Sequence, residues 1–269
     1  DHDLVRTAYP GHAIELAREA ALEGFDLIVA SGGDGTLNEV VNGILESGNP
    51  YDAALGILST GSACDFARFL GIPRDYRRMA QRLASPRLLR SDVGLVEYRH
   101  PDGSPGRRYF ISAAGLGFDG QVVEVASKAH FIRGPIPYFF GVLHSLSTYR
   151  NKDVRLRLDD RAEDRRILSV VVANGGFYAA GMRIAPDASL QDGRFDVLVV
   201  GDVSRLELLQ AFPKAYWGAH LSHPKVSHFR SQEVHVVSQE PMFIQAEGEL
   251  IGQAPVTFRM ISRGLRFIA

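Results

Sequence analysis

The chain of 269 residues contains a single cysteine, Cys64. One thiol cannot form an internal disulfide, and it excludes a metal site built from several cysteines. This cysteine usage fits a reducing compartment such as the cytoplasm. The chain also lacks an excess of either charge, since the formal net charge is −1. No basic field is available to attract nucleic acid, and we expect no nucleic-acid partner.

Long apolar runs are absent as well. A membrane-spanning helix needs roughly 18 to 20 apolar residues, whereas the nearest candidate, Ile136–Leu146, is shorter and contains Pro137 and His144. The start shows neither a signal-peptide pattern nor an initiator methionine. Because a polar run leads directly to Val5, we expect that a natural first strand is missing.

In the first part of the chain, residues 1–91, segments with apolar residues at helical spacing alternate with short apolar runs typical of strands. Apolar residues recur at helical spacing in His12–Glu23 and Thr36–Glu46, and short apolar runs at Phe25–Ala30 and Ala53–Leu58 indicate buried strands. Alternation of this kind predicts βαβ units, in which a parallel sheet carries helices on its faces. We expect an α/β domain over these residues.

From residue 92 to residue 269 the pattern changes to short runs rich in Val, Ile and Phe, separated by turn residues. Asp102–Gly106 is a hairpin signal between two of them. The predicted strands are Val93–Tyr98, Tyr109–Ala113, Val154–Leu158, Ile167–Ala173, Arg194–Val200, Glu233–Val237, Met242–Ala246 and Val256–Ile261. Helices are predicted around Gly120–Lys128, Ile136–Tyr149 and Ser204–Gly218. We expect an antiparallel second domain, a sandwich or barrel, whose extreme C-terminus returns to the first domain.

The sharpest motif is Ser31–Glu39, which reads Ser-Gly-Gly-Asp-Gly-Thr-Leu-Asn-Glu at a strand-to-helix junction. Its glycines let the backbone approach a ligand with no Cβ in the way. The helix N-terminus that follows favours phosphate through its free N–H groups and its dipole. Asp34 is expected to fix the turn or to meet a magnesium ion, and Thr36 to cap the helix or to donate to a phosphate oxygen.

Two better-known nucleotide motifs do not match this run. No Lys-Ser or Lys-Thr pair follows the glycines, as a Walker loop requires, and the spacing differs from the Gly-x-Gly-x-x-Gly of dinucleotide-binding folds. The nine histidines show no HExxH or similar ligand spacing. The motif therefore indicates either a phosphate site of another kind or a plain tight turn.

The longer run Gly32–Gly43 resembles the nucleotide loop of the diacylglycerol kinase catalytic-domain family, which includes bacterial lipid kinases, sphingosine kinases and ceramide kinases. Its Gly-Gly-Asp-Gly-Thr core is also shared with NAD kinases and phosphofructokinases. Further segments that resemble the family follow in order along nearly the whole chain: Thr7 with Pro10–Ala13, Gly61–Arg68, Ala173–Gly175, Ala185–Ala188, Asp192–Asp196 and Glu247–Glu249. The resemblance implies an NAD-kinase/phosphofructokinase-like α/β lobe followed by a β-rich lobe.

The resemblance also implies roles for particular residues. The implied ATP contacts are Thr7, Gly32, Gly33, Asp34, Gly35, Thr36, Asn38, Glu39, Ser62 and Asp65. Glu247 stands where the family carries its general base, and we assign it to catalysis together with Glu249. A structural magnesium ion, away from the reaction centre, would be held by the Asp192 carboxylate and by neighbouring main-chain carbonyl groups, those of Ser189 and Arg194.

Several positions depart from the family pattern. Ser62 replaces a threonine and keeps the hydroxyl, whereas Cys64 replaces an asparagine and loses an amide. Glu247 replaces an aspartate, which keeps the carboxylate but lengthens the side chain by one methylene group. Ala179 and Ala180 stand where the family is usually rich in glycine. These replacements bear on turnover rather than on fold.

Three functions stay open. The first is an ATP- and magnesium-dependent kinase for a lipid hydroxyl, with a diacylglycerol-like lipid as acceptor. The second is a kinase for a soluble acceptor such as NAD, and the third is a lipid-binding protein that has lost catalysis. The apolar segment Phe131–Tyr149 fits an acyl-chain pocket, a membrane contact or a core-packing helix. We expect a cytoplasmic protein that is peripheral to the membrane during catalysis, and a homodimer stays open.

Overall fold

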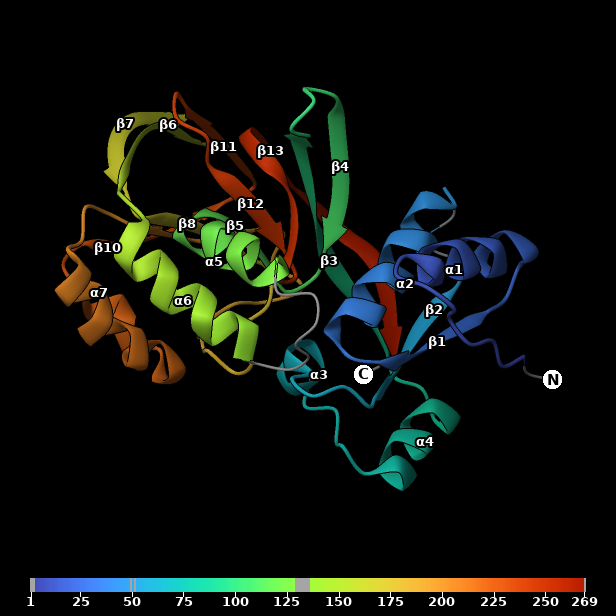
Figure 1. The fold of residues 1–269 in the computed structure, drawn as a ribbon. Helices are drawn as coiled ribbons and strands as arrows, with labels where there is room; N and C mark the ends of the chain where they lie inside the picture. Colours follow the sequence, from blue (N-terminus) through green and yellow to red (C-terminus); the bar gives the residue numbers. More distant parts are fainter. Residues whose placement is uncertain (1–2, 49, 51, 129–135, 269) are drawn as a thin grey trace.

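The computed structural model describes residues 3–48, 50, 52–128 and 136–268. Figure 1 shows two lobes, a smaller one near the N-terminus and a larger one in which helices flank antiparallel strands. None of the helices in these described ranges is long and apolar enough to cross a membrane.

The smaller lobe is built from α/β elements, and its first four follow the predicted order of helix, strand, helix and strand. Its elements are α1 (His12–Glu23), β1 (Leu27–Gly32), α2 (Asp34–Glu46), β2 (Ala54–Ser59), α3 (Asp65–Phe69) and α4 (Tyr76–Ala84). Strands β1 and β2 pair in parallel. Helices α1 and α2 can pack closely because Gly43 has no side chain. A Cβ at this position would collide with the Ile14 carbonyl oxygen.

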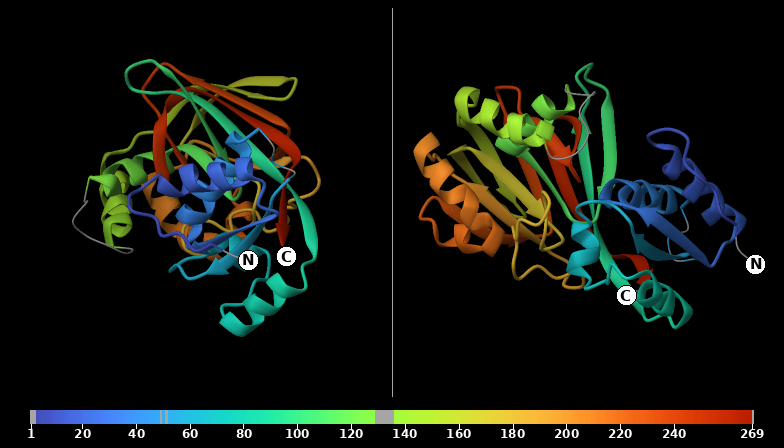
Figure 2. Two further views of the ribbon diagram at one scale, coloured as in Figure 1. Left: turned by 90° about the vertical axis from the view of Figure 1, so that its right-hand side faces the viewer. Right: turned by 60° about the horizontal axis from the view of Figure 1, so that its bottom comes forward.

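The larger lobe is dominated by antiparallel strands. They are β3 (Leu88–Arg99), β4 (Pro105–Phe110), β5 (Ala113–Gly117), β6 (Lys152–Leu158), β7 (Arg161–Ile167), β8 (Ser169–Ala173), β9 (Phe195–Val200), β10 (Val226–Ser231), β11 (Glu233–Ser238), β12 (Phe243–Ala246) and β13 (Glu249–Ile268). The accompanying helices are α5 (Phe118–Ser127), α6 (Ile136–Thr148), α7 (Arg205–Ala211) and the 3-10 helices η1 (Phe212–Trp217) and η2 (Ala219–Ser222). The right-hand view of Figure 2 shows that helices α6 and α7 lie on the side of this lobe away from the N-terminus.

Strand order explains how the core of the larger lobe forms. The main path runs β10-β9-β8-β5-β12-β13-β11-β6-β7. Val154, Leu156 and Leu158 alternate inward from β6, as a period of two requires. Phe110, Phe195 and Phe258 are fully buried and pack together, with ring centroids 5.6 and 6.2 Å from Phe110. The fold class predicted from the sequence, an α/β lobe followed by an antiparallel β-rich lobe, is confirmed.

Strand β13 belongs to both lobes. It pairs antiparallel with β3, β11 and β12, and its last residues pair in parallel with β2, where Arg266 lies opposite Ala54. Phe267 accordingly packs in the core of the smaller lobe, with its ring 5.0 Å from that of Phe66. In Figure 1 this strand runs from the larger lobe down to the C-terminus beside β2.

Some sequence-based assignments were wrong. The predicted strand Tyr109–Ala113 is split, because β4 ends at Phe110 and β5 begins at Ala113. Helix α4 and strands β7 and β10 were not predicted. Strand β7 reads Arg-Ala-Glu-Asp-Arg-Arg-Ile and buries only Ile167, so no apolar alternation marked it. As an edge strand it is formed by pairing with β6 rather than by burial of its own side chains.

One buried carboxylate joins segments that are far apart in the sequence. Asp92 on β3 is fully buried and accepts hydrogen bonds from the backbone N–H groups of Gly193 and Arg263, both at 2.7 Å. Arg263 has a φ of 54° and interrupts the pairing between β3 and β13. The carboxylate thus replaces strand pairing at that irregularity.

We expect Asp92→Ala to lower the free energy of unfolding by about 3 kcal/mol, because two buried N–H groups lose their acceptor. Urea denaturation followed by circular dichroism measures the effect. Asp160→Ala, which removes an exposed carboxylate from the β6–β7 turn, is the matched control and should change stability little. Equal stability of the two variants would contradict this role for Asp92.

Candidate active site

The predicted glycine loop lies between β1 and α2 and touches a second loop that follows β2. A Cβ on Gly61 would collide with the Gly33 Cα, so the two backbones meet without side chains between them. The N–H groups of Thr60 and Gly61 donate to the Gly32 carbonyl oxygen, at 3.0 and 3.1 Å. This contact leaves a surface of bare backbone at the start of α2.

The N-terminus of α2 has no side-chain cap. Gly33 is the N-cap residue, and Thr36 makes no capping hydrogen bond, so the predicted capping role of Thr36 is wrong. The Thr36 side chain instead lies over Gly32, where a Cβ would be 2.6 Å from it. The first-turn N–H groups therefore remain available to a phosphate.

Asp34 fixes a turn, which was one of the two roles expected for it. Its carboxylate accepts hydrogen bonds from the N–H groups of Asp65 and Phe66, both at 3.1 Å. It thereby caps α3, whose own N-cap residue, Cys64, supplies no side-chain hydrogen bond. The glycine loop and the loop after β2 are consequently held together by both backbone and side-chain contacts.

Cys64 adopts the left-handed conformation, with a φ of 53°, and is buried. Its Sγ donates to the Gly61 carbonyl oxygen at 3.2 Å. Asparagine tolerates this backbone conformation better than most residues do. The left-handed backbone gives a physical reason why asparagine suits this position in the family, and Cys64 holds the same turn with its thiol.

Asp65 reaches across to the larger lobe. It forms an ion pair with Arg68 at 2.7 Å and accepts a hydrogen bond from the N–H group of Ala180 at 2.8 Å. Ala179 and Ala180 both have positive φ, which explains why glycine is common at these positions. Burial raises the pKa of Asp65, and the charge of Asp34 raises it further.

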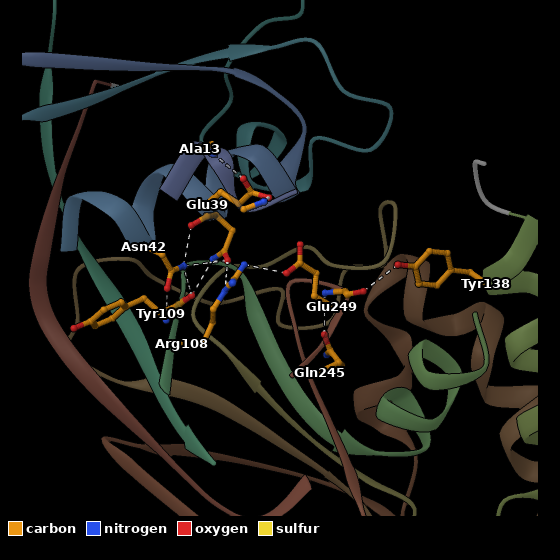
Figure 3. A network of polar contacts seen from close by, with 11 residues as sticks. Ala13, Glu39, Asn42, Arg108, Tyr109, Tyr138, Gln245 and Glu249 are labelled. Carbon is orange, nitrogen blue, oxygen red and sulfur yellow. Dashed lines mark hydrogen bonds and ion pairs between the residues drawn. The ribbon is translucent and has the colours of Figure 1, made fainter. Parts of the chain in front are cut away.

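Two of the expected nucleotide contacts are occupied by structural hydrogen bonds (Figure 3). The Glu39 carboxylate accepts from the N–H groups of Gly11 and Ala13, at 2.9 and 3.1 Å, and so holds the start of α1. Asn38 is buried and donates from its amide to the Tyr109 carbonyl oxygen at 3.0 Å. Both residues therefore help to fix the position of α2, the helix that follows the glycine loop.

Ser62 and Thr7 are both exposed. Ser62 lies on the loop after β2, where its carbonyl oxygen accepts a hydrogen bond from Arg74 at 2.9 Å. Thr7 lies on the segment before α1 and forms no hydrogen bond with the described residues of the glycine loop. Of these two residues, only Ser62 belongs to a segment that contacts the glycine loop, through Thr60 and Gly61.

The other side of the site is the tight turn between β12 and β13. Glu247 and Gly248 form it with φ values of 54° and 81°. Two positive φ values in a two-residue hairpin turn favour Asn-Gly or Asp-Gly. The aspartate that the family carries here suits the turn as well as the chemistry, and Glu247 adopts the same backbone.

Glu247 is bound where the predicted strand Tyr109–Ala113 breaks. Its Oε1 accepts hydrogen bonds from the N–H groups of Ile111 and Ser112, at 2.7 and 2.6 Å. Asn174 also binds at the break. Its side-chain amide donates to the Ile111 carbonyl oxygen at 2.8 Å, and its backbone N–H donates to the Ser112 carbonyl oxygen at 2.8 Å. The carboxylate is thus held by backbone rather than by flexible side chains.

Removal from water raises the pKa of Glu247 to about 7. The two N–H donors oppose this shift, and the negative charge of Asp34 adds to it. The glycine loop and the β12–β13 turn are therefore close enough for their charges to interact across the two lobes. A carboxyl with this pKa is divided between its acid and base forms near neutral pH.

Glu249 also faces the glycine loop, since a Cβ on Gly35 would lie 3.9 Å from its Oε1. It forms an ion pair with Arg108 at 2.9 Å (Figure 3). Burial raises the pKa of Glu249, and Arg108 opposes that shift. Arg108 also donates from Nε to the Asn38 side-chain oxygen at 3.3 Å, so it spans the two lobes.

Sequence reasoning missed the residues that support the β12–β13 turn. Gln245 accepts from the Gly248 N–H at 3.0 Å, and the Tyr138 hydroxyl donates to the Gly248 carbonyl oxygen at 3.0 Å (Figure 3). Buried Asp119 accepts from the Gln245 amide at 3.1 Å and from the Ser169 hydroxyl at 2.7 Å. The available signal was an aspartate in the first turn of the helix that begins at Phe118.

At the implied structural magnesium site, the Asp192 carboxylate already has partners within the chain. It is ion-paired with Arg230 and accepts a hydrogen bond from the N–H group of Arg194 at 3.1 Å. Arg230 therefore supplies a positive charge at Asp192.

A smaller α/β lobe with a bare glycine loop, facing a β-rich lobe that presents a carboxylate, defines the two-lobed fold shared by lipid kinases and NAD kinases. A solved diacylglycerol kinase structure from Bacillus anthracis superimposes with a TM-score of 0.70 at 20% identity, over 98% of this chain and 83% of that one. Yeast NADH kinase superimposes with a TM-score of 0.53 at 10% identity, over 91% of this chain and 62% of that one. Both likenesses concern the fold.

Sequence comparison identifies the family. Residues 1–96 match the diacylglycerol kinase catalytic domain, and residues 112–269 match the YegS C-terminal NAD kinase beta sandwich-like domain. The diacylglycerol kinase of Staphylococcus carnosus is 31% identical over 94% of this chain and 79% of its own length. That of Bacillus subtilis is 31% identical over 97% of this chain and 84% of its own length. The chain belongs to the diacylglycerol kinase catalytic-domain family.

We expect that neither Mg²⁺ nor EDTA shifts the melting temperature of the nucleotide-free protein, because Arg230 already neutralises Asp192. In Arg230→Ala the carboxylate is released, and Mg²⁺ should then raise the melting temperature relative to EDTA. Arg161→Ala, an exposed arginine at the edge of β7, serves as the control and should behave like the wild type. A clear metal-dependent shift in the wild type would contradict this view.

Proposed function

We propose that the protein transfers the γ-phosphoryl group of ATP to the hydroxyl group of a lipid, most simply a diacylglycerol. The observation that carries this proposal is the Glu247 carboxylate, held by backbone N–H groups opposite the glycine loop with a pKa of about 7. Membership of the family and the names of the relatives support the choice of reaction.

The ATP phosphates would lie against the glycine loop. The bare backbone at Gly32, Gly33 and Gly35 and the uncapped start of α2 offer N–H donors and room that a Cβ would fill. Ser62 would donate its hydroxyl from the neighbouring loop. A magnesium ion bound with ATP supplies charge neutralisation at the phosphates. Asp34 would meet that ion through water, since its carboxylate keeps free lone pairs.

Glu247 would act as the general base. Its Oε1 accepts from the two backbone donors, which leaves Oε2 as the oxygen that would receive a proton. The lipid hydroxyl would give its proton to Oε2 as its oxygen bonds to the γ-phosphorus and the bond from that phosphorus to ADP, the leaving group, breaks. Positioning contributes more than proton removal in a loose phosphoryl-transfer transition state. The rigid anchoring of this carboxylate serves that need.

Helix α6 supports a lipid as the acceptor. Tyr138, Phe139, Phe140 and Leu143 are exposed, with Phe139 62% accessible, so this part of the segment does not pack in the core. Tyr138 bonds to Gly248, which brings the helix to the β12–β13 turn. Residues 131–135, part of the apolar segment singled out in the sequence, lie outside the described residues. An apolar helix face at the reaction centre suits acyl chains.

The assay is transfer of label from γ-labelled ATP, with magnesium, to diacylglycerol, sphingosine, phosphatidylglycerol or NAD. We expect label in diacylglycerol. Glu247→Gln should lower the rate by about 10²- to 10⁴-fold, and Glu247→Asp should remain active because it keeps the carboxylate and the turn. Glu46→Gln, at the exposed end of α2, is the matched control. Label in NAD alone, or undiminished lipid labelling in Glu247→Gln, would refute the proposal.

The pH dependence tests the base separately. The base must be ionised to accept a proton, and its pKa is raised to about 7 in the free protein. We therefore expect kcat/KM for the lipid to rise with pH and to level off above about 7. The residual activity of Glu247→Gln should not show this inflection. An inflection near the ordinary glutamate pKa would show that another group is titrating.

A further inference from the structure

A pocket lies in the larger lobe, between the end of α6 and the start of α7. Its volume is about 440 Å³. In Figure 1 these two helices run alongside each other on the side of the lobe away from β1 and β2. Leu146, Leu168 and Leu208 give the pocket an apolar wall. The reaction described above uses none of these residues.

The rim of this pocket is strongly basic. Among the described residues that line it, Arg150, Arg166, Arg205 and Lys225 are basic and Asp202 is acidic. Two of the four cations are already paired: Arg166 lies 2.9 Å from Asp153 and 3.7 Å from Asp202, and Lys225 lies 2.9 Å from Glu207.

The remaining two cations are not compensated. Arg150 and Arg205 are exposed, and neither forms an ion pair with any residue in the described part of the chain. Two unpaired guanidinium groups at the mouth of a pocket attract an anion, and guanidinium geometry suits phosphate in particular.

Two hydroxyl groups, one on α6 and one on the residue that directly follows it, point to the kind of ligand. Ser145 is fully buried and lines the pocket, and its Oγ has no hydrogen-bond partner among the described residues. Tyr149 also lines the pocket, and its buried hydroxyl lacks a hydrogen-bond partner among the same residues. Burial raises the pKa of Tyr149, so this hydroxyl stays protonated and can donate. Buried hydroxyls without partners are costly, and a ligand oxygen would satisfy them.

We propose that this pocket binds the headgroup of an anionic phospholipid. The phosphate would lie between Arg150 and Arg205, an ester or glycerol oxygen would accept from Ser145 and Tyr149, and the start of an acyl chain would lie on the leucine wall. Charge, hydrogen-bond donors and an apolar wall occur together here, as an amphiphile with a phosphate group requires.

This lipid site is separate from the site of phosphoryl transfer. Tyr138 contacts the β12–β13 turn at one end of α6, and Ser145 lines the pocket seven residues further on. At 1.5 Å per residue this is about 10 Å along the helix. The pocket would anchor the protein to an anionic membrane surface, with α6 as the connection to the reaction centre. The inference does not depend on the proposed transfer reaction.

Binding can be measured without nucleotide, with monomeric dihexanoyl phosphatidylserine as the probe. The melting temperature and the fluorescence of Trp217, the single tryptophan, report on it; Trp217 ends η1, which directly follows α7. We expect a saturable response to phosphatidylserine and a much weaker one to dihexanoyl phosphatidylcholine or inorganic phosphate. An equal response to phosphatidylcholine, or to inorganic phosphate, would overturn the proposal.

Variants decide where the probe binds. Arg150→Gln/Arg205→Gln should weaken phosphatidylserine binding about tenfold or more, since each basic residue contributes strongly to anionic lipid binding. Arg77→Gln/Arg87→Gln removes the same charge from exposed positions of the smaller lobe and should bind as the wild type does. Glu247→Gln should also bind normally. Equal weakening in the two double variants, or loss of binding in Glu247→Gln, would refute a separate site.

Ser145→Ala tests the buried hydroxyl without removing charge. The substitution deletes an unpartnered polar group, so the ligand-free protein should be no less stable than the wild type. The stabilisation produced by phosphatidylserine should become smaller, because one donor to the ligand is lost. An unchanged phosphatidylserine response in Ser145→Ala would show that the hydroxyl does not face the ligand.

Discussion

Strand β13 is the constraint on which the active site depends. It begins directly after the Glu247–Gly248 turn, crosses from the larger lobe and ends beside β2 in the smaller one. Backbone hydrogen bonds along such a strand leave little freedom to slide, because a one-residue slip would turn every side chain to the opposite face. The strand therefore fixes the position of Glu247 relative to the smaller lobe, which carries the glycine loop.

Around this strand, polar contacts between the lobes complete the arrangement. Asn42 exchanges hydrogen bonds with the backbone of Tyr109, and Arg108 joins Asn38 to Glu249. Buried groups of this kind are costly unless each is satisfied, so they specify one way of joining the lobes. Burial raises the pKa of Asp65 and of Glu247, and the negative charge of Asp34 raises both further.

Helix α6 connects features that are otherwise separate. Its first turns present aromatic residues to solvent and hold Gly248 through Tyr138, whereas its last turn lines the basic pocket beside α7. Asp119 supports the same turn through Gln245 from the neighbouring α5. The β12–β13 turn is thus braced by residues from two helices of the larger lobe, and one of these helices leads to the proposed phospholipid site.

Much of the fold could be predicted from the sequence because it is written in local patterns. The helix His12–Glu23 was predicted with its observed bounds, and the alternation of short apolar runs with turns indicated the β-rich lobe. Strand β7 escaped because its charged residues form a strand only through pairing with β6. The break at Ile111 and Ser112 escaped because the carboxylate that accepts their N–H groups, Glu247, lies more than a hundred residues further along the chain.

For the site, the sequence by itself determined the glycine loop and the family, since both depend on contiguous residue types. Only the tertiary structure decided what each side chain does there. Asp34 caps α3, Glu39 holds α1, and Arg230 neutralises Asp192, and each of these partners is distant in the sequence. The physical reason is that hydrogen bonds and ion pairs depend on distances of a few ångströms, which folding creates between segments that sequence patterns describe separately.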